Sequence, residues 1–152
     1  MRYAFPCQIT RYDDSEFVVS FPDVREANTS GKNRAEALEM AEDALSVALG
    51  IYVAKRAAIP VPSPVVDGQE IVAVDPVVAA KLDLYSAMRE QGITKRALGR
   101  RLGLSGTTVT RLTDLGHRSH IGQVTKALRA VGRSLLIEVR AIPAHEQTLA
   151  SH

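Results

Sequence analysis

Residues 93–112 read ITKRALGRRLGLSGTTVTRL and show the pattern of two short helices joined by a tight turn. Thr94 can cap a first helix that runs to Leu102, and Ser105 can cap a second one. Gly103 falls between them, at a turn position that needs a positive φ angle, which glycine adopts without steric cost. The stretch therefore predicts a helix-turn-helix unit, an arrangement that many proteins use to bind DNA.

Small and apolar side chains in this stretch stand where the two helices would meet. Ala97 is small, as a close crossing of two helices requires, and Leu104 is placed to fill the core below the turn. Val109 and Leu112 are three residues apart, so they fall on one face of the second helix. We expect these four side chains to point inward, which leaves the polar side chains of the second helix exposed.

The exposed polar side chains suit contact with a DNA duplex. Recognition helices reach base edges near their N-terminal end, where threonine offers a hydroxyl to a base or a methyl group to thymine, and arginine binds guanine. Cations on the preceding helix and in the following loop suit phosphate contacts, which supply affinity without sequence information. The predicted DNA-binding residues are Lys95, Arg96, Arg100, Arg101, Ser105, Thr107, Thr108, Thr110, Arg111, His117 and Arg118. The alternative is a plain helical bundle with a basic surface.

Charge is divided unevenly along the chain, although the net charge is only +2. Residues 1–75 hold 7 Lys/Arg and 12 Asp/Glu, a net charge of −5, whereas residues 76–152 hold 12 and 5, a net charge of +7. An acidic front and a basic back suggest two domains with different partners, and the basic half fits a polyanion such as nucleic acid. The simpler alternative is that both charge runs are solvated faces.

The first 31 residues have the two-residue periodicity of β-strands. Residues 2–10 and 16–21 alternate apolar and polar side chains around a turn at 13–15, which predicts a hairpin, and a short third strand is expected over 27–30. Pro6 cannot donate to a neighbouring strand, so we expect the first strand to lie at an edge or to contain a bulge.

An amphipathic helix is predicted over residues 34–54, with Asn33 as its N-cap. Prolines alternate in residues 57–70, which form a linker or a connection to a last strand at 70–74. Asp75 and Pro76 begin a helix that Gly92 ends. Three short helices over 93–131 and a strand at 134–140, SLLIEVR, follow.

The predicted fold class is α+β, with a small N-terminal sheet plus helix and a C-terminal all-α helix-turn-helix domain that ends in a strand. The expected domain limits are 1–56 and 75–140, with a linker at 57–70 and a disordered polar tail at 141–152.

Other classes of protein find little support in the sequence. The single cysteine allows no disulfide framework. The N-terminus lacks the apolar run of a signal peptide, and no stretch is long and apolar enough for a membrane span. We therefore expect a cytoplasmic protein that is nucleoid-associated when bound to DNA. His117 and His120 do not form a convincing metal pair, and we expect no cofactor and no enzymatic activity. Asp13, Asp14 and Asp23, with Glu16, could bind Mg²⁺ for nuclease chemistry, but a hairpin turn explains the first two without a metal.

Two segments resemble the HicB-type antitoxins, in the same order as in that family. Residues 17–49 do so through Phe21-Pro22-Asp23-Val24 and the helix that follows, and the C-terminal part through the run at 97–105, then Asp114-Leu115 and Lys126-Ala127-Leu128. The resemblance implies a degenerate RNase H-like first domain that neutralises a small mRNA-cleaving HicA-type toxin, and a second domain that binds the operator DNA of its own operon and represses it. Arg25-Glu26-Ala27 departs from the Pro-Gly-Cys-like turn of many relatives.

An inhibitory role also fits the charge of the first domain, because an RNA-cleaving toxin presents a basic surface to its substrate. The predicted toxin contacts are Asp13, Asp14, Glu16, Asp23 and Glu26. A homodimer or higher even oligomer is expected, with the 134–140 strand as a dimer element. Two alternatives stay open: a stand-alone repressor whose first domain senses a small ligand, and an active metal-dependent nuclease.

Overall fold

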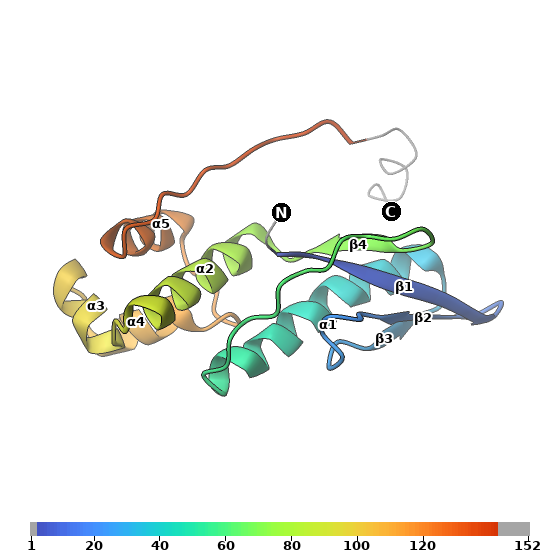
Figure 1. Ribbon diagram of the computed structural model, residues 1–152, viewed down its shortest axis with the longest axis horizontal. Coiled ribbons are helices and arrows are strands. Elements are labelled where there is room, and N and C mark those ends of the chain that lie inside the picture. Colours follow the sequence, from blue (N-terminus) through green and yellow to red (C-terminus); the bar gives the residue numbers. More distant parts are fainter. Residues whose placement is uncertain (1–2, 143–152) are drawn as a thin grey trace.

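A computed structural model of the chain describes residues 3–142 and has an α+β fold (Figure 1). The elements in chain order are β1(Ala4–Asp13), β2(Glu16–Ser20), β3(Thr29–Gly31), α1(Arg34–Ala54), β4(Glu70–Ala73), α2(Pro76–Gln91), α3(Lys95–Leu102), α4(Gly106–Thr113) and α5(Ile121–Ala130). The sheet and α1 form one end of the molecule, and α3, α4 and α5 gather at the other. Within residues 3–142, no helix combines the length and the hydropathy that a membrane span requires.

The sheet has the order β3-β2-β1-β4, and all neighbouring strands are antiparallel. Its first strand changes partner halfway: Ala4–Cys7 pairs with β4, and the part from Gln8 to Asp13 pairs with β2. Pro6 pairs only on the β4 side, so the residue that cannot donate lies where β1 has a single neighbour. The predicted third strand is present, but it begins two residues later and ends one residue later than expected.

Helix α1 forms over the predicted residues because its local signals agree. The Asn33 side chain accepts a hydrogen bond of 2.8 Å from the Glu36 backbone N–H, as an N-cap does. One face of the helix buries Ala41 and Leu45 against Phe5 and other side chains of the sheet. This packing removes the apolar faces of the sheet and the helix from water, which is the main favourable term in folding.

Helix α2 takes part in both apolar cores of the molecule. Leu82 is buried in the core of the sheet and α1, whereas Leu84 and Ala87 are buried with α3, α4 and α5. The Tyr3 hydroxyl also donates a 3.2 Å hydrogen bond to the Asp83 carboxylate. The acidic and basic halves are therefore packed together through this helix.

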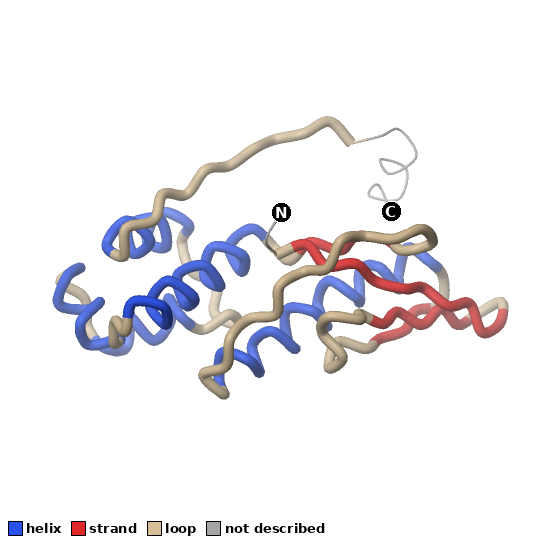
Figure 2. The backbone as a smooth tube through the Cα atoms, in the orientation of Figure 1, coloured by secondary structure: helices blue, strands red, loops and turns tan. Residues whose placement is uncertain are grey.

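Residues 55–69 connect α1 to β4, and from residue 57 they run as an extended segment along the unit of the sheet and α1 (Figure 2). The Ser63 backbone N–H and hydroxyl donate hydrogen bonds of 2.8 and 2.6 Å to the Asp23 carboxylate. Ile59 packs against the apolar core of the sheet and α1, and the Tyr85 hydroxyl donates to the Ala57 carbonyl at 2.6 Å. These contacts hold the proline-rich segment on the surface of the fold.

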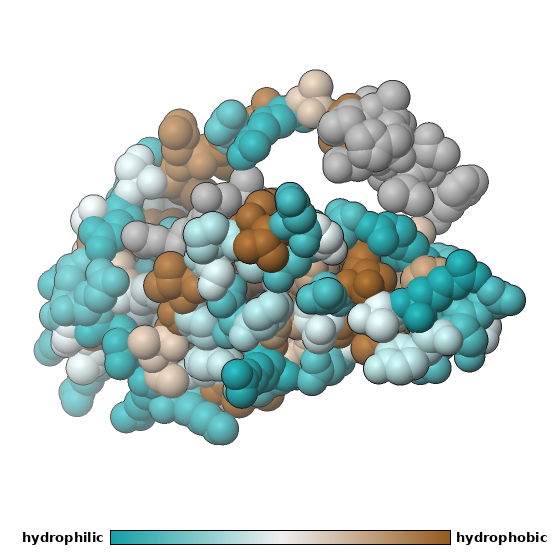
Figure 3. All heavy atoms as spheres, turned by 45° about the vertical axis from the view of Figure 1, so that its right-hand side comes forward, coloured by the Kyte–Doolittle hydropathy of each residue, from teal (hydrophilic) through white to brown (hydrophobic). Residues whose placement is uncertain are grey.

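The strand predicted at 134–140 is wrong for the single chain. These residues belong to an extended arm that arches away from α5, and its apolar side chains are visible along the arch in Figure 3. Leu136 and Val139 are 90% and 92% exposed. A β-strand needs a neighbouring strand for its backbone hydrogen bonds, and the arm has none beside it within the described residues. The predicted disordered tail lies outside the described residues from 143 onward.

Candidate functional site

The caps and the turn between α3 and α4 are confirmed. The Thr94 hydroxyl accepts a 3.1 Å hydrogen bond from the Ala97 N–H, and the Ser105 hydroxyl accepts one of 3.3 Å from the Thr108 N–H. Gly103 ends α3 with φ 66° and ψ 34°, the left-handed conformation that glycine favours. The chain therefore turns sharply at Gly103, and α4 starts three residues later at Gly106.

The close contact between α3 and α4 lies at Gly99, and its prediction at Ala97 is wrong. Gly99 is buried, and a Cβ added there would lie 3.0 Å from the Leu104 carbonyl oxygen and 3.3 Å from Val109 Cγ2. Ala97 is only half-buried. Ala97 and Gly99 are two positions apart on α3 and therefore face different directions, and only the crossing geometry shows that Gly99 is the residue that must lack a side chain.

Helix α4 turns its apolar side chains inward, as predicted. Val109 and Leu112 are fully buried, and Thr113 is buried as well, with its hydroxyl donating to the Thr110 carbonyl at 3.1 Å. Thr107, Thr110 and Arg111 are exposed on the outer face. The outer face of α4 thus carries two hydroxyl groups and a guanidinium.

Thr108 is oriented differently from its neighbours. It is half-buried, and its hydroxyl lies 3.1 Å from the Ser105 hydroxyl that caps α4. These two predicted DNA-binding side chains therefore interact with each other at the helix start, which leaves them less available to a ligand than Thr107 or Thr110.

A groove of about 830 Å³ runs between α3 and α4. Its lining residues are Lys95, Arg96, Gly99, Arg100, Gly103, Leu104, Gly106, Thr107, Thr110 and Arg111. Four of these side chains are cationic and none is acidic, so the groove attracts polyanions. The structure brings six of the predicted DNA-binding residues together here.

Three residues predicted to contact phosphate lie outside this groove. The Arg101 guanidinium donates a 2.9 Å hydrogen bond to the Ala130 carbonyl, at the C-terminal end of α5. His117 Nδ1 lies 3.4 Å from the Ser119 hydroxyl in the loop after α4, and Arg118 is exposed in the same loop. Arg101 is therefore engaged in joining two helices of the basic unit.

The ammonium of Lys81 holds the end of α4, a role that the sequence did not reveal. Lys81 is fully buried in α2, and its Nζ donates to the carbonyls of Arg111 at 3.0 Å, Asp114 at 2.8 Å and His117 at 2.5 Å. Burial lowers the pKa of Lys81, and the negative charge of Asp114 partly opposes that shift. A lysine between apolar residues of a predicted helix is the only signal of this role in the sequence.

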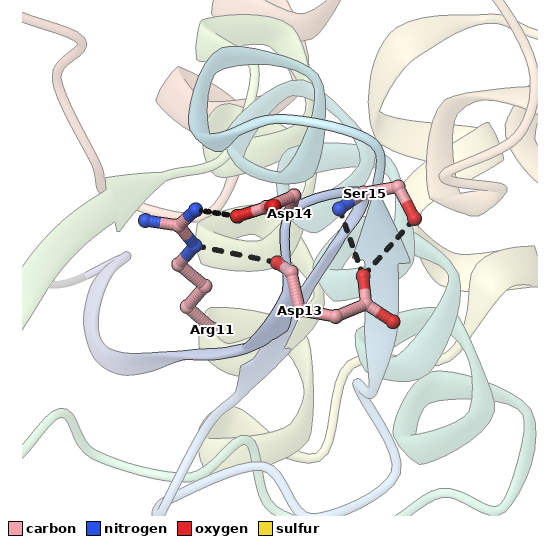
Figure 4. Close-up of polar contacts among 4 residues, drawn as sticks. All are labelled: Arg11, Asp13, Asp14 and Ser15. Atoms are coloured by element: carbon pink, nitrogen blue, oxygen red, sulfur yellow. Dashed lines mark hydrogen bonds and ion pairs between the residues drawn. The ribbon is translucent and has the colours of Figure 1, made fainter.

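The predicted acidic residues divide into two groups, of which the first forms the tip of the β1–β2 hairpin (Figure 4). The Asp13 carboxylate accepts hydrogen bonds of 2.8 and 3.0 Å from the Ser15 N–H and hydroxyl, and these bonds lower its pKa. Arg11 forms an ion pair with Asp14 across the same turn. Glu16 is exposed at the start of β2. The tip thus presents carboxylates to solvent, with Asp13 and Asp14 also stabilising the turn.

The second group lies in the connection after the other end of β2. Asp23 accepts the two hydrogen bonds from Ser63, and the Glu26 carboxylate accepts one of 2.9 Å from the Tyr52 hydroxyl. Both carboxylates thus tie this connection to neighbouring segments. Among residues 3–142, no three His, Cys, Asp or Glu side chains are grouped closely enough to share a metal ion.

A further set of carboxylates, which the sequence did not single out, lines a cleft of about 760 Å³ between α1 and the loop after α4. The acidic lining residues are Glu39, Glu42, Asp43, Asp75 and Asp114. Burial raises the pKa of Glu42, and the charges of Asp75, Asp43 and Glu39 add to the increase. Only the tertiary structure brings these side chains together.

Fold and charge together define a small α+β protein in which an acidic sheet-and-helix unit is packed against a basic helical unit. A family profile described as "HicB_like antitoxin of bacterial toxin-antitoxin system" matches residues 4–83, which include the whole sheet, α1 and the first half of α2. The chain belongs to this HicB-like antitoxin family.

Full-length relatives agree with this assignment. Antitoxin HicB 1 of Photorhabdus laumondii is 39% identical over 139 residues, which cover 91% of this chain and 87% of that protein. Antitoxin HicB of Escherichia coli strain K12 is 38% identical over 135 residues, 89% of this chain and 96% of that protein. Antitoxin HicB of Pseudomonas fluorescens is 36% identical over 124 residues, 81% of this chain and 85% of that protein. The similarity thus extends through the basic unit.

Proposed function

We propose that the chain neutralises a HicA-type mRNA-cleaving toxin through its acidic unit and represses its own operon through α3 and α4. Family membership and the names of the relatives support an antitoxin role and a toxin partner. The observation that carries the DNA-binding part is the cationic groove beside the exposed outer face of α4. A stand-alone repressor that senses a ligand is not favoured by this family membership.

In this proposal, α3 and α4 act as a helix-turn-helix with α4 in the major groove. Thr107, Thr110 and Arg111 then face base edges, and Lys95 and Arg96 lie against the phosphates at the start of α3. Base contacts give sequence preference and phosphate contacts give general affinity, so replacing the two kinds of residue has different consequences.

Electrophoretic mobility shifts with DNA from upstream of the operon, and with an unrelated duplex of equal length, test this arrangement. We expect Arg111→Ala to weaken binding to the operon DNA by about 1–3 kcal/mol with little effect on the unrelated duplex. Lys95→Ala should weaken both complexes. It should also reduce the slope of log affinity against log salt concentration by about 0.9 for each phosphate that the variant no longer binds. Arg25→Ala, an exposed change in the acidic unit, is the control. Wild-type binding by the Arg111 variant would contradict this docking.

For the toxin contact, the hairpin tip is the accessible part of the predicted acidic set. Asp14 and Glu16 lie at the exposed hairpin tip, where Asp14 also pairs with Arg11, whereas Asp23 and Glu26 tie the connection after β2 to neighbouring segments. Charge complementarity speeds association with a basic partner and favours the correct orientation. We therefore expect Asp14→Lys combined with Glu16→Lys to reduce rescue of growth from a co-expressed toxin. Asp67→Lys, in an exposed turn before β4, should rescue as well as wild type.

The dimer that we propose forms through the arm at residues 134–140. Unpaired extended backbone with exposed apolar side chains readily pairs with an equivalent segment of another chain. The two-fold symmetry of operators for helix-turn-helix proteins fits such a dimer. Ile137→Glu, at a side chain that is 68% exposed, should convert a dimer to a monomer in sedimentation experiments. A variant that stays dimeric would show that the interface lies elsewhere.

A further inference from the structure

A second basic cleft, of about 750 Å³, lies where the end of α1 meets α2, α3 and α4. Its cationic lining residues come from three segments of the chain: Arg56 directly after α1, Arg89 in α2, and Lys95 and Arg96 in α3. Asp114 is the one acidic residue among its described lining. The cleft thus adds Arg56 and Arg89 to the cations at the start of α3.

Arg56 has a backbone conformation that does not favour arginine. Its φ of 57° is in the left-handed region, and within residues 3–142 it is the one residue other than glycine with a positive φ. The Ala57 N–H donates to the Tyr52 carbonyl at 2.9 Å and the Arg56 N–H to the Val53 carbonyl at 3.1 Å, the helix-ending motif that usually contains glycine. A side chain at this position costs stability relative to glycine.

Within residues 3–142, the Arg56 guanidinium makes no polar interaction that would offset this cost. It makes no hydrogen bond or ion pair with any residue in the described part of the chain, whereas its backbone is held firmly. Its own carbonyl accepts from Arg89 Nε at 3.4 Å, and the Ala57 carbonyl accepts from the Tyr85 hydroxyl at 2.6 Å. A strained residue with a fixed backbone and an unused charged side chain suggests a role in binding.

The second cleft is continuous with the groove between α3 and α4, because Lys95, Arg96 and Thr110 line both. A duplex that contacts the outer face of α4 and is held by Lys95 and Arg96 therefore passes the mouth of the second cleft. We propose that Arg56 and Arg89 bind the phosphate backbone of that duplex, so that the acidic unit contributes directly to DNA affinity. This inference depends on the proposed DNA-binding function and extends its interface beyond the helix-turn-helix.

The variant Arg56→Gly distinguishes DNA binding by the Arg56 side chain from a contribution of that side chain to the stability of the fold. Glycine relieves the backbone strain, so we expect the variant to unfold at a higher temperature than wild type while binding DNA several-fold more weakly. The full-length protein is measured by thermal unfolding and by fluorescence anisotropy with labelled duplex from upstream of the operon. Arg56→Lys keeps the charge and should bind nearly as wild type, and Arg25→Ala is the control for a distant exposed arginine.

Salt dependence identifies the interaction as one with phosphate. Removing one phosphate interaction should flatten the slope of log affinity against log salt by about 0.9, equivalent to about a threefold change in the affinity ratio between 50 and 200 mM salt. Arg89→Gln should give a similar decrease, and the double variant the sum. The same decreases are expected with an unrelated duplex, because phosphate contacts carry no sequence information.

Three results would overturn the inference. An unchanged affinity and salt slope for Arg56→Gly would show that the side chain does not contact DNA. A lower unfolding temperature would show that arginine supports the fold. A decrease confined to the operon duplex would indicate a base contact. Failure of the wild-type protein to bind either duplex would instead refute the proposed DNA-binding function. If Arg111→Ala weakens binding but the Arg56 and Arg89 variants do not, the DNA-binding function stands and the interface does not extend to the second cleft.

Discussion

Replacing Lys81 with methionine tests how α4 and the loop after it are held in place. The ammonium of Lys81 is buried and donates to the carbonyls of Arg111, Asp114 and His117, at distances of 2.5 to 3.0 Å. These carbonyls lie at and just beyond the C-terminal end of α4, where a cation is also favoured by the helix dipole. Methionine keeps an apolar stem of similar length and removes only the charged donor.

The expected decrease in stability follows from the partners that remain. A hydrogen bond from a charged donor contributes about 1.5–3 kcal/mol. The Arg111 and Asp114 carbonyls keep backbone donors, at 3.4 Å from Asp114 N and 3.2 Å from His117 N, and the cost of burying the ammonium disappears. We therefore expect the free energy of unfolding to fall by about 2–3 kcal/mol, which lowers the unfolding temperature by about 8 °C for a chain of this size.

Urea and thermal unfolding of the two proteins measure this difference, and Lys126→Met is the matched control because Lys126 is exposed on α5. The control should change stability by less than about 0.5 kcal/mol.

The difference in stability between wild type and Lys81→Met should also depend on pH, in a direction that follows from the Lys81 pKa. Because burial lowers the Lys81 pKa below its ordinary value of 10.5, the unfolded chain binds this proton more tightly. Wild-type stability should therefore rise relative to the variant as the pH increases toward that value.

A Lys81→Met protein as stable as wild type, or more stable, would refute this reasoning. Replacing buried charges by apolar groups is sometimes stabilising, so this outcome is physically accessible. It would mean that burying the ammonium costs as much as its three hydrogen bonds contribute, and that the end of α4 is fixed by packing alone.

Three further predictions concern glycine packing and the buried thiol. Gly99→Val should lower the free energy of unfolding by about 3 kcal/mol in urea unfolding, because its side chain would overlap Leu104 and Val109, and a neutral result would disprove the close crossing. Gly50→Ala should raise that free energy by about 1 kcal/mol, since no described atom beyond its chain neighbours and the α1 backbone lies within 4 Å of the added Cβ; a decrease would show hidden crowding. Burial, with the charge of Glu70, raises the pKa of Cys7 from 9.0 to about 11, so the folded thiol stays protonated while the unfolded one ionises. Stability should then fall by about 2 kcal/mol between pH 9 and 11, more steeply than in Cys7→Ser, and equal slopes would contradict the burial.

Local signals account for the parts of the fold that the sequence predicts well. Asn33, Thr94 and Ser105 cap the helices that their positions predict, and Gly103 ends α3 in the left-handed conformation. Each of these signals involves residues no more than a few positions apart, so its physical cause lies within the short segment that contains it. The same locality explains why periodicity alone predicts the exposed face of α4.

Contacts between distant segments account for the features that the sequence does not predict or predicts wrongly. Alternation predicts a strand at 134–140, but pairing needs a second strand, and residues 3–142 place none beside it. The acidic residues predicted to act together lie at opposite ends of β2. The carboxylates of α1, which were not predicted to act together, line one cleft with Asp75 and Asp114. Such groupings depend on how helices cross and where loops return, which no local pattern encodes.

By itself, the sequence determined most of the segments that are helices or strands, how most of these begin and end, and how charge divides between the two halves. Only the tertiary structure decided that Gly99 is the point of closest approach, that Lys81 is buried against the end of α4, and that Arg56 joins the cations of α3. The physical reason is that caps and periodicity arise from neighbouring residues, whereas burial and electrostatic proximity arise from packing between segments that are far apart in the chain.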